Sequence, residues 1–145
     1  MMRHLRHDEI DKKKWDDCIR SSFNGIIYAY SWYLDVVCED WESLVENDYE
    51  RVFPLTGKRK YGISYLYQPF FTQQLGVFSK SILSAEVVEE FLKAIPAKYR
   101  YIETNLNTLN KIDSDGFKVE PQRNFELDLI HSYENISKQE ACHSP

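Results

Sequence analysis

The spacing of the apolar residues changes near residue 41, and this change restricts the fold more than any other feature of the sequence. Before it, apolar side chains recur three and four residues apart, as on one face of a helix: Trp15, Cys18 and Ile19. Asp11 precedes them as a potential N-cap, and the helix is predicted to end near Ser21. After residue 41, runs of extended type flank Asn47-Asp48, which predicts a hairpin turn. Helices followed by a strand meander favour an α+β domain with a mixed sheet.

The remaining elements follow from the same reasoning. Pro54 restricts its own strand to a sheet edge or a bulge, because proline has no N–H to donate. The further predicted elements are an edge strand at 3–7, an extended run at 26–30, a short helix capped by Ser31, strands at 41–47, 49–60, 62–69 and 99–107, a helix at 85–95 capped by Ser84, a closing hairpin at 117–121 and 124–130, and a helix from 132.

Composition and charge limit the classes of function. The 145 residues fit one domain, and 43% hydrophobic with 28% charged residues is typical of a globular chain. The net charge of −5 argues against DNA binding, which needs clustered cations. Three cysteines without a CxxC pair indicate reduced thiols and a cytoplasmic protein. No apolar run approaches the roughly 18 residues of a membrane span.

The stretch YLYQPFFTQQLGVFS, residues 65–79, combines five aromatic residues with a proline and a glycine. Tyr67 continues a strand that Pro69 ends. We expect Phe70-Phe71 to fill the core, because large apolar side chains are usually buried. Gln73 and Gln74 are adjacent in extended chain and point to opposite sides, so at most one of them is expected to face a ligand.

Three segments carry a resemblance to a known family: NGIIYAYSWYLDVV (24–37), VFPLTGKRKYGISYLYQPFFTQQLGVFS (52–79) and YIETNLN (101–107). They resemble the N-terminal lobe of two-lobed GNAT-like acyltransferases of the Fem type (FemABX-like), and uncharacterised GNAT-like proteins of Bacteroidetes. The resemblance implies a GNAT-like lobe at 1–138. Residues 139–145 have no obvious structural role in the sequence, so we expect a disordered tail there. It also implies a partner, either a missing C-terminal GNAT-like lobe or a second copy of this chain.

The resemblance places the coenzyme A turn of GNAT enzymes at 75–87. That turn needs closely spaced glycines, so that the backbone can approach a pyrophosphate. Gly76 is the only glycine there, and the chain has no GxG. We therefore expect no cofactor for this lobe, and a role in binding a small-molecule or peptide-linked substrate without catalysis of its own. The catalytic residues stay unassigned, and the substrate-groove candidates are Tyr67, Gln68, Gln73, Gln74 and Asn105.

Other polar residues allow two interpretations each. Lys58, Arg59 and Lys60 are either the solvated end of a hairpin or an anion site for a phosphate-bearing or RNA-linked substrate. Glu103 is a general base or, as the commoner case, an ion-paired strand residue.

His4 and His7 would point to opposite faces of a strand, so no metal site is predicted. The alternative function is a stand-alone binding or interaction protein that acts as a homodimer.

Overall fold

The computed structural model describes residues 1–113 and 116–123. The strands are β1 (Met2–Leu5), β2 (Glu42–Glu46), β3 (Arg51–Leu55), β4 (Gly57–Lys60), β5 (Ile63–Leu66), β6 (Phe78–Ser79) and β7 (Tyr99–Ile102). The helices are α1 (Lys12–Ser21), α2 (Ser31–Val37) and α3 (Ala85–Lys93), with 3-10 turns η1 (His7–Glu9) and η2 (Ile27–Ala29). The predicted α+β class is confirmed.

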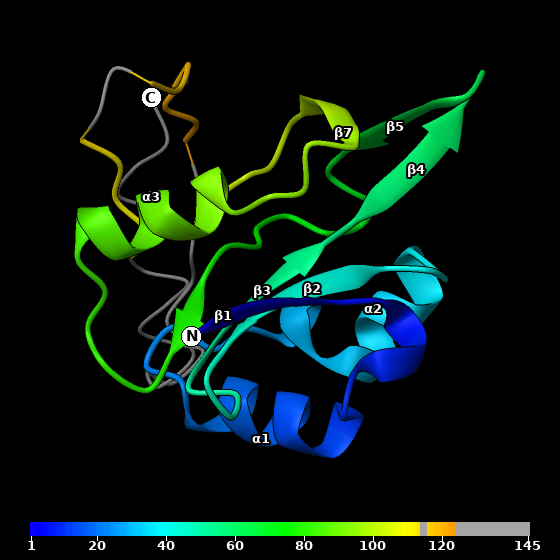
Figure 1. The fold of residues 1–145 in the computed structure, drawn as a ribbon. Helices are drawn as coiled ribbons and strands as arrows, with labels where there is room; N and C mark the ends of the chain where they lie inside the picture. Colours follow the sequence, from blue (N-terminus) through cyan, green and yellow to red (C-terminus); the bar gives the residue numbers. More distant parts are fainter. Residues whose placement is uncertain (114–115, 124–145) are drawn as a thin grey trace, which may run out of the picture.

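A four-stranded antiparallel sheet, in the order β1-β2-β3-β6, forms the centre of the molecule. Helices α1 and α2 cover one face and α3 the other (Figure 1). Neighbouring strand residues point to opposite faces, so Val45 packs with the α1–α2 layer and Leu44 packs with α3. Both faces of this sheet are therefore buried, and two apolar clusters are separated by it.

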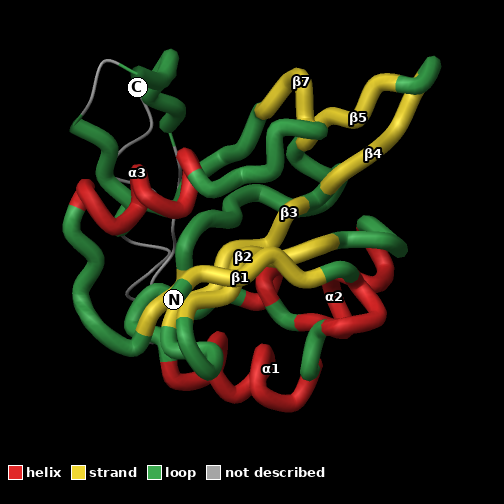
Figure 2. The backbone as a smooth tube through the Cα atoms, viewed as in Figure 1, coloured by secondary structure: helices red, strands yellow, loops and turns green. Residues whose placement is uncertain are grey.

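A second sheet, in the order β4-β5-β7, extends from the first. Strand β3 runs on into β4 across a short break at Thr56 (Figure 2). Tyr61 and Gly62, both with positive φ, make the two-residue turn between β4 and β5. Strand β7 returns parallel to β5. The single mixed sheet expected from the sequence is thus two sheets, because the run 49–60 divides between them.

The N-terminal helix agrees with the prediction. The Asp11 carboxylate accepts a hydrogen bond from Lys14 N at 3.0 Å, as an N-cap does. Trp15 is fully buried, donates its indole N–H to Ala29 O at 2.7 Å and packs on Trp41 at 4.7 Å between ring centroids.

The run 26–30 is not a plain extended segment, because it contains η2. Two predicted caps also differ. Ser31 is the first residue of α2, with Tyr30 in the cap position, and the Ser31 hydroxyl bonds Asp16 instead. Ser84 is in the cap position of α3 without a capping hydrogen bond.

Pro54 behaves as predicted. It pairs with Ser43 of β2, whereas β6 pairs only with Arg51 and Val52 on the other side of β3. Pro54 therefore sits where β3 has a neighbour on one side alone, and its missing N–H leaves no gap in the ladder.

The prediction that Phe70-Phe71 fill the core is wrong. Their side chains are 85% and 90% exposed. They are the two central residues of a turn closed by a hydrogen bond from Thr72 N to Pro69 O at 3.2 Å, and this turn faces outward.

Three buried asparagines hold the segment that leads into β6. Asn110 accepts a hydrogen bond from Val77 N at 2.6 Å and donates to Val77 O at 3.0 Å. Asn24 donates to the same carbonyl at 2.8 Å and accepts from Ser79 N at 3.3 Å. Asn107 supports Asn110 through a 3.1 Å hydrogen bond. These side chains supply the partners that a neighbouring strand would otherwise give to this buried backbone.

Several predictions for the C-terminal part of the chain concern residues that lie partly or wholly outside the described ranges. Residues 117–121 are described and form no strand, so that half of the closing hairpin is wrong. The other half at 124–130, the helix from 132 and the tail 139–145 lie outside the described residues. Within 1–113 and 116–123, no helix has the length and apolar character required to cross a membrane.

Replacing Asn110 with alanine tests the asparagine network. Asn110→Ala leaves the Val77 N–H buried without its partner, so we expect the free energy of unfolding to fall by about 1–3 kcal/mol. Urea denaturation measures this loss, with Thr108→Ala as the control, because Thr108 is exposed in the same segment. Equal stability of the two variants would contradict the structural role of the network.

Candidate functional site

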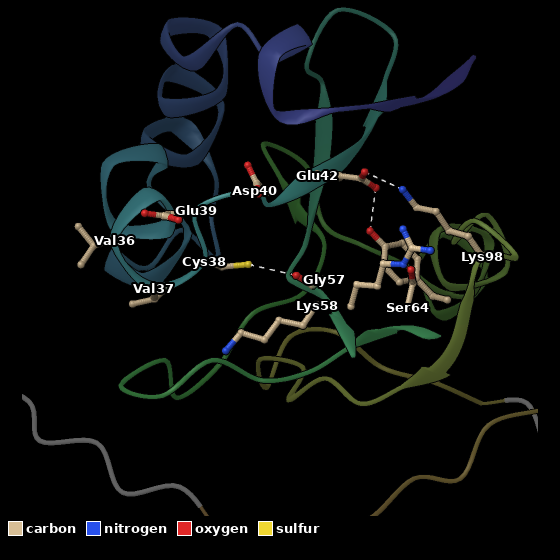
Figure 3. A pocket seen from close by; sticks show the side chains of 12 residues that line it. Val36, Val37, Cys38, Glu39, Asp40, Glu42, Gly57, Lys58, Ser64 and Lys98 are labelled. Carbon is tan, nitrogen blue, oxygen red and sulfur yellow. Dashed lines mark hydrogen bonds and ion pairs between the residues drawn. The ribbon is translucent and has the colours of Figure 1, made fainter. Parts of the chain in front are cut away.

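A cavity of about 500 Å³ lies at the seam between the two sheets. Four parts of the chain contribute to its wall: the end of α2 with the loop to β2, the start of β4, Ser64 of β5, and the start of β7 (Figure 3). The cavity exists because β3 and β4 belong to different sheets, so the second sheet diverges from the first at this point.

Glu42 is the centre of the hydrogen bonding in the wall. Its carboxylate accepts from His4 Nε2 at 2.7 Å, Lys98 Nζ at 2.6 Å and Tyr99 OH at 2.7 Å. Burial, the largest single influence, raises the pKa of Glu42, but the hydrogen bonds from Lys98, Tyr99 and His4 together outweigh it and lower that pKa. Burial and the hydrogen bond to Glu42 raise the pKa of Tyr99. Glu42 is therefore an ionised anchor that joins β1, β2 and the start of β7.

Gly57 allows Tyr99 to reach Glu42. A Cβ on Gly57 would lie 2.8 Å from the Tyr99 ring and from its hydroxyl oxygen. The Gly57 carbonyl also accepts from Cys38 Sγ at 3.6 Å (Figure 3). The glycine thus brings the tyrosine ring and the thiol close to one point of the backbone.

Cys38 is an unreactive wall residue. It is buried, and burial is the main reason why the pKa of its thiol is raised; Asp40 raises that pKa further, against smaller opposing effects of Tyr67 and Lys58.

Charges of opposite sign enter the cavity from different elements. Lys58 and Arg59 come from β4, and neither has an ion-pair partner among the residues that the structure describes. Lys58 Nζ lies 4.6 Å from the centre of the Tyr67 ring. Glu39 and Asp40 come from the loop between α2 and β2 and are exposed. The cavity therefore offers unpaired cations on one wall and carboxylates on another.

The third member of the basic run lies apart from the cavity. Lys60 does not contribute to the wall, and its Nζ lies 5.4 Å from the centre of the Tyr61 ring at the tip of the hairpin. The structure brings Lys58 and Arg59 together at the cavity, whereas the position of Lys60 fits the solvated hairpin end.

None of the groove candidates of the 65–79 stretch lines this cavity. Tyr67 is half-buried behind Lys58, and its backbone N–H bonds Thr56 O at 3.1 Å. Gln68 donates to Thr72 O at 2.9 Å and accepts from Asn105 N at 2.9 Å, so it connects two loops. Gln73 is exposed and Gln74 half-buried, and neither contributes to a described cavity.

Asn105 lies at a second cavity, of about 440 Å³, beyond the end of β7. The Asn105 amide donates to Gln73 O at 3.3 Å. Glu103 lines the same cavity and accepts from Tyr101 OH at 3.0 Å. The ion pair expected for Glu103 is not among the ion pairs of residues 1–113 and 116–123. Of the predicted groove residues, Asn105 alone lines a described cavity, and the others lie in the strand end and loops around it.

His4 and His7, for which no shared metal site is predicted, have separate hydrogen-bond partners. His4 bonds Glu42, and His7 Nδ1 lies 3.3 Å from Trp41 O. In the part of the chain that the structure describes, no group of three potential metal ligands is found.

Sequence analysis missed the residues that organise the main cavity, Glu42, Lys98 and Tyr99. Glu42 and Tyr99 are 57 positions apart in the chain and meet because β2 and β7 both begin at the seam. A usable indication was that a charged residue, Glu42, directly follows Trp41 near the start of a predicted strand.

Comparison of the chain with known protein families, curated proteins and solved structures returned no match.

Replacing Glu42 with glutamine tests the anchor. The folded pKa of Glu42 lies below its ordinary value of 4.5, so the ionised carboxylate stabilises the fold fully above pH 4.5 and loses this effect as the pH falls through the folded pKa. Because the carboxylate is only partly shielded, we expect Glu42→Gln to cost about 1 kcal/mol at pH 7. The difference should shrink below pH 4.5.

Urea denaturation at several pH values, with both proteins folded in the absence of urea, measures this difference. Glu39→Gln is the control, because Glu39 is exposed at the same cavity. A deficit that is equally large at pH 3 and pH 7 would show that the charge of Glu42 is not the cause.

Proposed function

We propose that this chain is the substrate-binding lobe of a GNAT/Fem-like acyltransferase and has no catalysis of its own. The observation that carries the proposal is the cavity between the sheets. Lys58 and Arg59 on β4 form no ion pair within residues 1–113 and 116–123, and carboxylates line the cavity from the loop after α2. The order of elements supports the GNAT-like part of the proposal. Two helices follow β1, antiparallel strands follow them, and β7 returns parallel to β5 after α3.

The surroundings of Gly76 support the expected lack of a coenzyme A site. A Cβ on Gly76 would lie 2.6 Å from Asn110 Oδ1 and 3.1 Å from Asn107 Nδ2. The space that a side chain of residue 76 would occupy is therefore filled by asparagine side chains. The single glycine in this position serves internal packing and is not free to approach a phosphate.

The charges of the cavity favour a ligand that carries both signs. Lys58 and Arg59 would hold a carboxylate or phosphate, and Glu39 with Asp40 would hold an amine. A small peptide or a peptide-linked substrate has this combination. Such a ligand would complete two half-sites that otherwise face water.

The binding test uses the dipeptide alanylalanine and two capped forms. The N-acetyl form lacks the amine, and the C-terminal amide lacks the carboxylate. We expect the free dipeptide to bind with a dissociation constant of roughly 1 mM, and each capped form to bind at least about threefold more weakly. NMR titration of the backbone amides measures the three dissociation constants. It also identifies the residues whose chemical shifts change on binding.

Variants of the basic run make the test specific. Lys58→Ala/Arg59→Ala should weaken dipeptide binding by about tenfold, and Lys60→Ala by less than about twofold, because Lys60 lies outside the cavity wall. Equal loss in both variants, or no effect of capping, would contradict the proposed site. Acetyl-CoA binding tighter than about 0.1 mM would contradict the absence of an acyl-donor site.

A further inference from the structure

Two phenylalanine side chains project into solvent from the turn that follows β5. Phe70 and Phe71 are 85% and 90% exposed, although phenylalanine is among the residues most often buried. Isolated apolar residues on a surface need no explanation, but adjacent aromatic side chains at the tip of one turn form a patch.

The backbone at Phe71 is strained. Its φ is +63°, and a bulky side chain rarely adopts this left-handed region. The third position of a turn with this geometry is usually glycine or asparagine. Such strain costs about 1 kcal/mol or more and persists only where the surroundings enforce it. A phenylalanine at this position therefore lowers stability, which points to a role outside the folded chain itself.

Hydrogen bonds from three sides fix the turn. The Tyr33 hydroxyl donates to Phe71 O, and Thr72 N donates to Pro69 O at 3.2 Å. Gln68 donates to Thr72 O at 2.9 Å. The two phenyl rings are thus presented on a rigid support, which reduces the entropy lost when a partner binds.

The exposed aromatic surface continues onto α2. The Tyr33 ring lies 5.7 Å from the Trp32 ring, and Trp32 is 54% exposed. Each large aromatic side chain can bury about 150–250 Å². Phe70, Phe71 and Trp32 together offer about 500 Å² per molecule, the size of a small and reversible interface.

The distribution of charge indicates what covers this surface. From Tyr61 to Ser79 no residue is charged, while the chain as a whole carries −5. A two-fold contact sets the same patch against itself, so an uncharged patch avoids like-charge contact between two acidic molecules. A two-fold contact through the outer edge of β4 would instead place Lys58 and Arg59 of one molecule near the same cations of the other.

We propose that the turn Pro69–Thr72, together with Trp32, forms a two-fold contact between two copies of this chain. The contact does not rest on the proposed ligand-binding function, because neither phenylalanine nor Trp32 lines the cavity between the sheets.

Sedimentation velocity over roughly 10–500 µM full-length chain tests the proposal. We expect a reversible monomer–dimer equilibrium. Phe71→Gly should raise the dimer dissociation constant by at least about tenfold, because each dimer loses two buried rings. At a concentration where both proteins are monomeric, the same variant should keep or raise the melting temperature, since glycine accepts the positive φ without strain.

Ile82→Ser is the matched control. Ile82 is an 88% exposed apolar residue in the loop before α3, so its loss should leave the dissociation constant within about twofold. Three results would overturn the proposal: a monomer throughout the concentration range, a dimer that Phe71→Gly leaves intact, or open-ended assembly in place of a dimer. A lower melting temperature of Phe71→Gly, measured with both proteins monomeric, would also overturn it by assigning Phe71 a role in the stability of the monomer. Binding to neutral phosphatidylcholine vesicles by a chain that stays monomeric would assign the rings to a lipid surface.

Discussion

The peptide group of Val77 is held on both sides by asparagine side chains, and much of the fold depends on this arrangement. Asn24 reaches it from the loop after α1, and Asn110 reaches it from the loop after β7. Leu75, two residues earlier, is paired with the backbone around Leu106 through hydrogen bonds of 2.7 and 2.8 Å. The segment 75–79 therefore connects the helical layer, the central sheet and the chain after β7. Buried amides without such partners would each cost about 1–3 kcal/mol.

The same segment closes the side of the sheet while β4 and β5 extend away from it. Because β6 pairs with only two residues of β3, the rest of β3 is free to continue into the second sheet. The divergence of the two sheets leaves a space that side chains do not fill. Glu42, Tyr99 and Lys98 tie the walls of that space together, and Lys58 and Arg59 remain available to a ligand.

Local patterns predicted much of the fold. The cap at Asp11 and the buried stripe of α1 are fixed by contacts within a few residues, so sequence spacing reveals them. The turn after β2 and the one-sided pairing at Pro54 follow from backbone chemistry alone. The burial of Phe70 and Phe71 was predicted wrongly. The prediction used the average burial of phenylalanine, which contains no information about whether the local backbone turn points outward.

The candidate site was predictable only in part. Lys58 and Arg59 were identifiable as a basic run, but the exclusion of Lys60 depends on where the hairpin tip lies. Glu42 and Tyr99 could not be paired from sequence, since nothing in a single chain relates positions 57 residues apart.

The sequence by itself determined the α+β class, the first helix and the absence of a glycine-rich phosphate turn before α3, because each depends on residues close together in the chain. Tertiary structure alone decided that the strands form two sheets, that Gly76 is packed by asparagines, and that charges of both signs meet at one seam. The physical reason is that these features arise where segments distant in sequence pack against each other.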